Sequence, residues 1–232
     1  MNRKKLVVFT GAGVSADSGI ATFRDADGLW ARYRIEDVCT PEALERNRPL
    51  VIEFYNKRRK ELLETSPNAG HYAIASLEEY FDVEVITQNI DDLHERAGSS
   101  HVTHLHGELR KLRSSIDETL SFPIEGWEQK LDDRAPDGSL ARPFVVFFGE
   151  AVPMFEQAAR IASRADLMIV AGTSLAVYPA ASLVRYVSPQ TSIYLVDPGT
   201  PDTQGIRNLR QHIRMHGAEG LPLLAEELKK LA

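Results

Sequence analysis

Residues 6–25 read LVVFTGAGVSADSGIATFRD, and this stretch decides the fold class. An apolar run, Leu6–Phe9, ends at Thr10 and is followed directly by Gly11-Ala12-Gly13. Residues 11–16 fit G-x-G-x-x-G/A, the pattern found where a strand turns into a helix beneath a dinucleotide. Glycines there let the backbone approach a pyrophosphate, and the helix N-terminus favours the negative charge. The stretch therefore predicts a buried strand that leads into a nucleotide-binding loop.

A plain strand–turn–helix corner is the alternative interpretation of this segment. A dinucleotide site usually carries an acidic residue about 20 positions after the glycines, where it binds the ribose. The acidic residues near that distance leave the choice open, because two come early and two come late: Asp25, Asp27, Glu36 and Asp37.

Composition and charge narrow the classes of protein. The 232 residues carry a net charge of −6, which gives no reason to expect nucleic acid as the main partner. No stretch approaches the roughly 20 apolar residues of a membrane span, and the first residues lack the apolar core of a signal peptide. We therefore expect a cytoplasmic protein. The single cysteine, Cys39, excludes an intrachain disulfide and a cysteine-rich zinc site.

Short apolar runs recur along the chain and predict an α/β fold. They are rich in Val, Ile, Leu and Phe without alternation, which is typical of parallel strands covered on both faces. Segments with helical periodicity lie between several of them, so we expect a Rossmann-like, doubly wound parallel sheet. The predicted strands are Leu6–Phe9, Val83–Ile86, Val145–Phe148, Leu167–Val170 and Ile193–Val196.

Two stretches, residues 25–66 and 110–142, interrupt this alternation and predict a second, smaller inserted lobe. We expect one domain over residues 1–232, with a large lobe at about 1–27, 67–109 and 143–232. The small lobe would then comprise about 28–66 and 110–142. Packing is expected to hold the second insertion through its apolar residues, Phe122, Ile124, Trp127 and Leu131.

Polar and glycine residues follow every predicted strand. The segments after the strands read GAGVSADSG, TQNIDDLHERAG, GE, GTS and DPGTPD. Because the carboxyl ends of parallel strands form the ligand crevice of an open sheet, these loops predict a shared site. Within the second segment, one residue would suffice to cap the following helix, and the excess of amides and carboxylates favours contact with a ligand.

The stretch HVTHLHGE offers two interpretations for its histidines. If it is a short strand, His104 and His106 share a face and His101 points the other way. A metal site built from histidines alone is one interpretation. A general base is the other, because the ordinary pKa of histidine, about 6.5, suits proton abstraction at neutral pH.

A predicted helix over Leu50–Glu64 places one arginine on its apolar stripe. Val51, Phe54/Tyr55, Arg58 and Leu62 recur at helical spacing, so Arg58 should face inward. Its neighbours Lys57, Arg59 and Lys60 would stay in water. A core carboxylate or an outward-reaching stem would accommodate Arg58 structurally. Alternatively, the arginine binds a carboxylate that arrives with the substrate, with help from the Tyr55 hydroxyl.

Several of these motifs together resemble one known family. GAGVSADSGIATFRDADGLW, TQNID, HLHGEL, FGE and GTSLAVYPA, in this order, resemble the sirtuin family of NAD-dependent protein deacylases. The resemblance runs from about residue 5 to the C-terminus, interrupted at about 112–142. It implies that NAD is consumed as a co-substrate, and that acylated-lysine proteins or peptides are the partners. The implied products are the free lysine, nicotinamide and O-acyl-ADP-ribose.

The resemblance also implies a role for individual residues. The residues that match the family's catalytic positions are His106, as the base, with Asn89 and Asp91. Those that match its cofactor-binding positions are Gly11, Ala12, Gly13, Ala21, Thr22, Phe23, Arg24, Trp30, Gln88, Asn89, Ile90, Asp91, Gly172, Thr173, Ser174, Asp197 and Ala218. The substrate would be bound by Tyr55, Arg58, Phe148, Gly149, Glu150 and Val177.

The acyl group is suggested by the pair Tyr55 and Arg58. This Tyr-x-x-Arg pair resembles that of the class III sirtuins, which remove succinyl and malonyl groups. DADGLWARYRIEDVCTPEAL and PNAGH also resemble bacterial members of that class, which are often active on acetyl-lysine too. The resemblance therefore implies a deacylase with both activities.

The sequence departs from the family pattern in two places. Most sirtuins carry four zinc-binding cysteines in the small lobe, whereas residues 110–142 contain none, so no structural zinc is predicted. Asp197 stands where the family commonly has Asn, and could accept hydrogen bonds from the adenosine ribose. Two rival functions remain: a protein mono-ADP-ribosyltransferase, and a module that senses NAD without catalysis.

Overall fold

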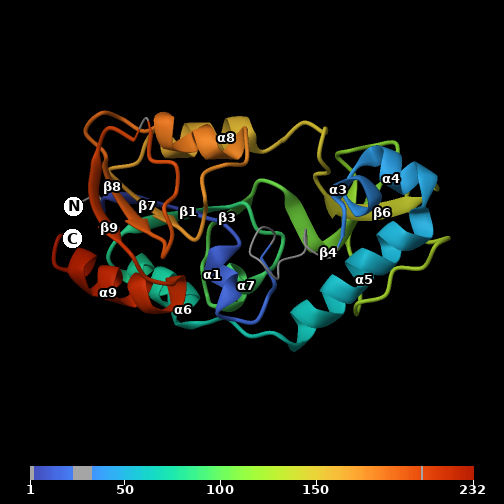
Figure 1. The fold of residues 1–232 in the computed structure, drawn as a ribbon, viewed down its shortest axis with the longest axis horizontal. Coiled ribbons are helices and arrows are strands. Elements are labelled where there is room, and N and C mark those ends of the chain that lie inside the picture. The colour runs from blue at the N-terminus through green and yellow to red at the C-terminus, as the bar shows by residue number, and fades with distance from the viewer. Residues whose placement is uncertain (1–2, 23–32, 205) are drawn as a thin grey trace.

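The computed structural model describes residues 3–22, 33–204 and 206–232. Its larger sheet has six parallel strands in the order β3-β2-β1-β7-β8-β9. The expected α/β fold with a Rossmann-like parallel sheet is confirmed (Figure 1). The strands are β1 (Lys5–Thr10), β2 (Asp82–Thr87), β3 (Val102–His104), β7 (Leu167–Ala171), β8 (Ser192–Val196) and β9 (Leu209–Ile213).

The central strand β1 contributes side chains to two hydrophobic cores, one on each face of the sheet. Val7 and Phe9 pack with the alanines of α8 (Phe155–Ala162). Leu6 and Val8 point the other way and pack with α6 (Ala69–Ser76) and α9 (Gly217–Lys229). Figure 1 shows α8 on one side of the sheet and α6 and α9 on the other. This double burial explains why the run has no polar alternation.

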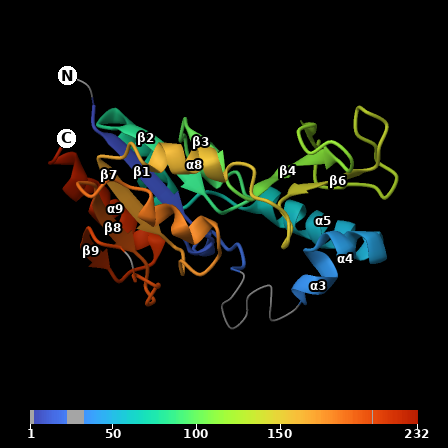
Figure 2. The same cartoon turned by 90° about the horizontal axis from the view of Figure 1, so that it is seen from above.

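A second sheet of three antiparallel strands lies at the other end of the molecule. Strand β4 (Gly107–Ser114) pairs with β5 (Ser121–Pro123) and β6 (Ala141–Val145). Three helices lie beside this sheet, α3 (Ile35–Val38), α4 (Pro41–Arg46) and α5 (Arg48–Glu64) (Figure 2). Other short helices among the described residues are α1 (Gly13–Ala16), η1 (Leu77–Glu79), α7 (Leu93–Arg96) and η2 (Ala180–Arg185).

The prediction of a parallel strand at Val145–Phe148 is wrong. Val145 ends β6 in the antiparallel sheet, and Phe147 and Phe148 lie in the loop that follows. Phe147 is only 1% exposed, because it packs in the core of the small lobe. Within the run only Val145 and Phe147 are buried, whereas Phe148 is 41% exposed, and an apolar run alone does not identify the sheet to which a strand belongs.

Helix α5 carries a buried arginine that was expected in water. Asn47 caps the helix by accepting a hydrogen bond from Leu50 N at 3.3 Å. The expectation for Arg58 is confirmed, since it is buried, but the expectation for Arg59 is wrong, since its side chain is 0% exposed. The small lobe covers α5 on more than one side, so residues outside the apolar stripe are buried as well. Burial lowers the pKa of Arg59 to about 10, which leaves it charged at neutral pH.

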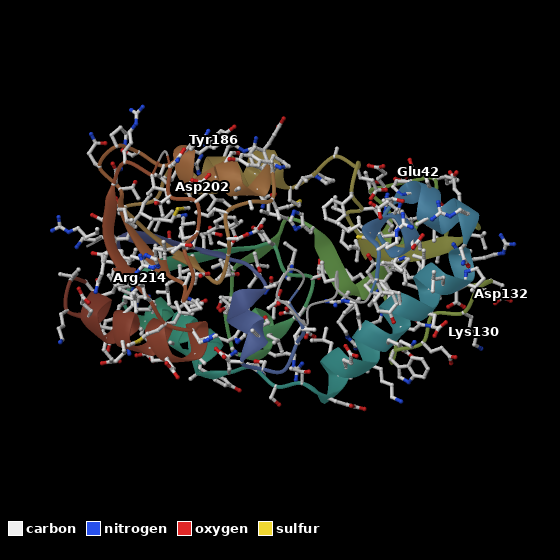
Figure 3. The ribbon with its side chains drawn as sticks, viewed as in Figure 1. Glu42, Lys130, Asp132, Tyr186, Asp202 and Arg214 are labelled. Carbon is white, nitrogen blue, oxygen red and sulfur yellow. The ribbon has the colours of Figure 1, made fainter. Side chains whose placement is uncertain are left out.

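Polar side chains of α5 hold the outer loop of the segment 110–142. Ile124 is buried, but Trp127 and Leu131 are 39% and 49% exposed, so the expectation that they anchor the segment by packing is wrong. Arg59, Asn56 and Arg48 instead donate hydrogen bonds to the carbonyl oxygens of Trp127, Gln129 and Leu131. Figure 3 shows the side chains of Lys130 and Asp132 from this loop at the outer end of the lobe. No helix in the described part of the chain is long and apolar enough to cross a membrane.

Candidate functional site

The loops after β1 and β7 meet backbone to backbone and form the floor of the site. Gly13 N donates a hydrogen bond to the carbonyl of Gly172 at 2.9 Å, and Gly11 N donates to Ala171 at 3.1 Å. Gly172 has a φ of +60°, and a Cβ added there would lie 2.3 Å from Val14 N. Glycine is therefore required at Gly172 for two reasons, the backbone conformation and the close approach of the two loops.

A cavity of about 610 Å³ opens above this floor and extends to the small lobe. Its size lies in the range of small-molecule and cofactor sites. The structure brings most of the predicted site residues to its lining. These are Gly11, Ala12, Gly13, Thr22, Tyr55, Arg58, Gln88, Asn89, Ile90, His106, Phe148, Gly149, Glu150, Gly172, Thr173, Ser174, Val177 and Asp197.

Six predicted residues are missing from that list, and the structure describes three of them. Ala21 is exposed, and Ala218 donates its backbone N–H to the carboxylate of Asp17 at 3.1 Å. Next to it, Gly217 and His216 do line the cavity. Asp91 lies behind Asn89, in a buried polar network. The other three, Phe23, Arg24 and Trp30, lie outside the described residues.

His106 faces the cavity as a neutral imidazole. Its Nδ1 lies 3.0 Å from the carbonyl oxygen of Gln88, which is an acceptor, so Nδ1 carries the proton. Burial lowers the pKa of His106, and the bond to Gln88 opposes this only in part. At neutral pH the Nε2 lone pair is therefore available to accept a proton, as a general base requires.

His104, in the same HVTHLHGE stretch, belongs to an ion pair with Glu95. His104 is buried with Nδ1 2.8 Å from the carbonyl of Asn89 and Nε2 2.7 Å from Glu95 Oε1. Burial alone would lower the pKa of His104, but the bond to Glu95 raises it overall. Within the residues that the structure describes, no three His, Cys, Asp or Glu side chains gather as a metal site would need. The stretch thus supplies one imidazole to the cavity and one to an ion pair.

Asn89 and Asp91 belong to a hydrogen-bonded network beneath the cavity. Asn89 Nδ2 donates to Ser15 Oγ at 3.1 Å, and Ser15 Oγ donates to Asp91 Oδ2 at 3.0 Å. Asp91 Oδ1 also accepts from Leu93 N at 3.2 Å, but the N-cap residue of α7 is Asp92, so the prediction that Asn89 or Asp91 caps this helix is wrong. Burial raises the pKa of Asp91, while Leu93 N and Ser15 lower it. The network fixes the Asn89 amide at the edge of the cavity.

The two residues predicted to bind the acyl group lie together where the cavity enters the small lobe. The Tyr55 hydroxyl donates to Cys39 Sγ at 3.3 Å, and burial raises its pKa well above the ordinary value. The Arg58 guanidinium lies 5.9 Å from the ring centroid of Phe54. Burial lowers the pKa of Arg58, whose ordinary value of 12.5 is so high that it stays charged. A cation and a hydroxyl thus line one pocket wall.

Glu150, predicted to contact substrate, is engaged by arginines of the small lobe. Its carboxylate accepts hydrogen bonds from Arg142 Nη1 at 2.6 Å and Arg113 Nη2 at 3.1 Å. It also accepts from Phe147 N at 2.7 Å. The carboxylate therefore holds the loop of Phe148 and Gly149, and both of these residues line the cavity.

Comparison with known proteins now assigns the chain to a family. The protein-family model described as "Sir2 family" matches residues 11–179, more than half of the chain. The chain belongs to the Sir2 family. A relative from Bacteroides thetaiotaomicron, named NAD-dependent protein deacylase, is 54% identical over 98% of this chain and 97% of its own length.

Solved structures of Sir2 proteins share the whole fold. A Sir2 homologue in complex with NAD is 41% identical, with a TM-score of 0.88 over 99% of this chain and 91% of its own. A Sir2 protein bound to a deacetylated p53 peptide and 3′-O-acetyl ADP-ribose is 34% identical, with a TM-score of 0.82 over 98% of this chain and 94% of its own. The present structure therefore has the Sir2 fold, a parallel Rossmann-like sheet with a smaller antiparallel lobe.

Sequence reasoning missed several side chains that line the cavity of this Sir2 protein. Cys39 contacts the Tyr55 hydroxyl, Phe147 forms part of the pocket wall, and His216 lies on the side of Asp197. Phe147 directly precedes the FGE motif, and that position was the one available signal. Cys39 and His216 carry none, because only the fold brings them to the cavity.

Proposed function

We propose that this Sir2 protein removes succinyl, malonyl and also acetyl groups from lysine side chains of acylated proteins or peptides. The general activity rests on the family relationship, which makes the chain an NAD-dependent protein deacylase that consumes NAD as a co-substrate. The acyl preference rests on one observation: Tyr55 and Arg58 line the same cavity as His106.

The residues present suit NAD. The glycine floor at Gly11, Gly13 and Gly172 brings main chain, without side chains, to one wall of a cavity of about 610 Å³. Gln88, Thr173 and Asp197 add polar groups along it, as a sugar and diphosphate require. Bound NAD would supply an electrophilic ribose carbon, since its bond to nicotinamide is the one that breaks.

Two groups of the chain would then take part in the reaction: one would accept a proton, and the other would hold the ribose side of the cavity in place. His106 Nε2, neutral because of burial, would take a proton from a ribose hydroxyl and so activate that oxygen. Asn89, held by Ser15 and backed by Asp91, would keep the ribose side of the cavity in a fixed position. Such preorganisation lowers the barrier without any further movement of the protein.

Acyl selection would follow from charge at the pocket wall. A succinyl or malonyl group ends in a carboxylate, which a planar guanidinium can bind in bidentate fashion. Hydrogen bonds to a charged group contribute about 1.5–3 kcal/mol, which is roughly a ten- to hundredfold change in specificity. A neutral acetyl group would not use Arg58, so it would be accepted without that gain.

The test compares the wild type with Arg58→Met on matched acetyl-, succinyl- and malonyl-lysine peptides. We expect kcat/KM to fall at least about tenfold for the two charged acyl groups and much less for acetyl. Lys57→Met, an exposed neighbour on the same helix, is the control. Mass spectrometry should identify nicotinamide and O-acyl-ADP-ribose, whereas an ADP-ribosylated protein would indicate a transferase. Equal losses on all three peptides in Arg58→Met would contradict the proposed acyl recognition.

A further inference from the structure

Arg142 lies just behind the acyl-binding wall, and its side chain is 7% exposed. It extends from β6, and both terminal nitrogens of its guanidinium donate hydrogen bonds to Glu150. Nη1 lies 2.6 Å from Oε1, and Nη2 lies 3.2 Å from Oε2. Nη2 also donates to the carbonyl of Val145 at 3.3 Å. This fork geometry holds the guanidinium plane in one orientation.

That plane faces an aromatic ring. Arg142 Cζ lies 4.0 Å from the ring centroid of Phe147, well within the range of a cation–π contact. Glu150, the partner of Arg142, also accepts a hydrogen bond from Phe147 N at 2.7 Å. Phe147 is therefore held at its backbone by the carboxylate and at its ring by the guanidinium.

The ring in turn supports the residue proposed to bind the acyl carboxylate. Phe147 stacks on Tyr55 with centroids 5.9 Å apart and an interplanar angle of 17°. Both rings are almost fully buried, so neither can shift without displacing the other. A continuous path of contacts thus runs from Arg142 through Phe147 to the Tyr55 hydroxyl in the cavity.

We propose that Arg142 is a positioning residue for acyl selection, because it fixes Phe147 and thereby the place of the Tyr55 hydroxyl. This inference rests on the proposed function, in which Tyr55 and Arg58 bind the acyl carboxylate. A lysine cannot replace the arginine, because an ammonium group makes neither the two-pronged contact with Glu150 nor a planar stack on Phe147.

The nearby Arg113 provides a matched control. It donates to the same Glu150 oxygen at 3.1 Å and is 10% exposed, and its other ion-pair partner is Glu118. Removal of Arg113 takes one cation away from the same carboxylate and leaves the path from Arg142 to Tyr55 intact. A difference between variants of the two arginines therefore reports the ring contact and excludes a general effect of charge.

The experiment measures kcat and KM for succinyl- and acetyl-lysine peptides, and KM for NAD, in wild type, Arg142→Met, Arg142→Lys, Phe147→Leu and Arg113→Met. We expect both Arg142 variants and Phe147→Leu to lower the succinyl-to-acetyl ratio of kcat/KM about tenfold, with KM for NAD changed less than about twofold. Arg113→Met should keep the wild-type ratio. Thermal melting of each variant shows that the folded protein is assayed.

The outcomes separate the two proposals. Wild type that fails to process succinyl peptide refutes the proposed acyl preference. Wild type that processes it, with an unchanged ratio in Phe147→Leu, refutes the positioning role of Arg142 alone. The role is also refuted if Arg142→Lys restores the wild-type ratio, or if Arg113→Met lowers it as much as Arg142→Met does. Phe147→Leu keeps the test valid should an Arg142 variant not fold.

Discussion

Arg59 Nε on α5 donates a hydrogen bond to the carbonyl oxygen of Leu109 on β4, across 2.8 Å. Its Nη1 donates to the carbonyl of Trp127, also at 2.8 Å, so one buried side chain joins a helix, a strand and a loop. We expect Arg59→Met to lower the free energy of unfolding by about 3 kcal/mol, because buried carbonyls lose their donors. Urea denaturation would measure this, and limited proteolysis should then cut within residues 110–142.

Lys60→Met is the control for that variant, because Lys60 is adjacent on the helix and exposed, and it meets the same loop through a cation–π contact with Trp127 at 5.7 Å in place of a hydrogen bond to a carbonyl. Its stability should stay within about 1 kcal/mol of the wild type. Equal stabilities for Arg59→Met and wild type would show that the lobe does not depend on this guanidinium.

The decrease of kcat/KM at acid pH should reflect the burial of His106. Burial lowers the pKa of His106, so the ring stays neutral and basic at pH values where a free histidine, with a pKa of about 6.5, would already be protonated. We expect kcat/KM for a neutral acetyl-lysine peptide to fall only below that pH. His106→Ala should lower kcat by about 10²–10⁴-fold and remove the decrease of kcat/KM at acid pH. A decrease of kcat/KM centred at or above pH 6.5 would be inconsistent with a buried neutral base.

Stability should fall in acid through a second histidine. Burial lowers the pKa of His71 to about 4, so between about pH 6.5 and 4 the unfolded chain binds a proton that the folded one does not. The free energy of unfolding should therefore decrease as the pH falls, by about 3 kcal/mol over that window from this group.

The variant His71→Asn tests this, because an amide oxygen can replace Nδ1 as the acceptor for Asn68 N. His94, whose pKa burial also lowers well below its usual value, stays in both proteins. Denaturation curves at several pH values should thus show a shallower acid dependence in the variant. Parallel curves for the two proteins would rule out His71 as the source.

Strong chelation should leave this protein unchanged. The sequence has one cysteine, and α5 side chains donate hydrogen bonds to the loop within residues 110–142, where the family resemblance would imply zinc-binding cysteines. We expect the melting temperature and the deacylase activity to be the same before and after treatment with a chelator. Elemental analysis that finds one equivalent of zinc per chain would overturn the expectation.

The sequence predicted the parts of the site that follow strands of the parallel sheet. The glycines after β1, residues Gln88, Asn89 and Ile90 after β2, and the GTS segment after β7 all line the cavity, because strand ends in one sheet necessarily converge. Phe147 was harder to place, because an apolar run looks the same whether it joins a sheet or fills a core. Of the two edge strands, β9 was not predicted, and β3 was considered only as one interpretation of HVTHLHGE, because these strands are short or polar.

The small lobe shows a different limit of sequence reasoning. The apolar stripe of α5 correctly predicted that Arg58 faces inward, since periodicity finds the face that touches the main core. It could not find Arg59, which lies about 100° around the helix. That second buried face exists only because β4 and the loop near Trp127 fold over it, and those contacts are distant in sequence.

Helix α5 holds the pair proposed to bind the acyl group, Tyr55 and Arg58, on one side and the buried Arg59 on another, so the rotation of the helix about its axis matters for both. A single inserted residue between Tyr55 and Arg59 would turn everything beyond it by about 100°. Such a change would break the contacts of α5 with the loop near Trp127 and would also disrupt the proposed acyl-binding wall. Engineers who wish to alter the acyl repertoire of this scaffold should therefore exchange side chains in α5 and leave its length untouched.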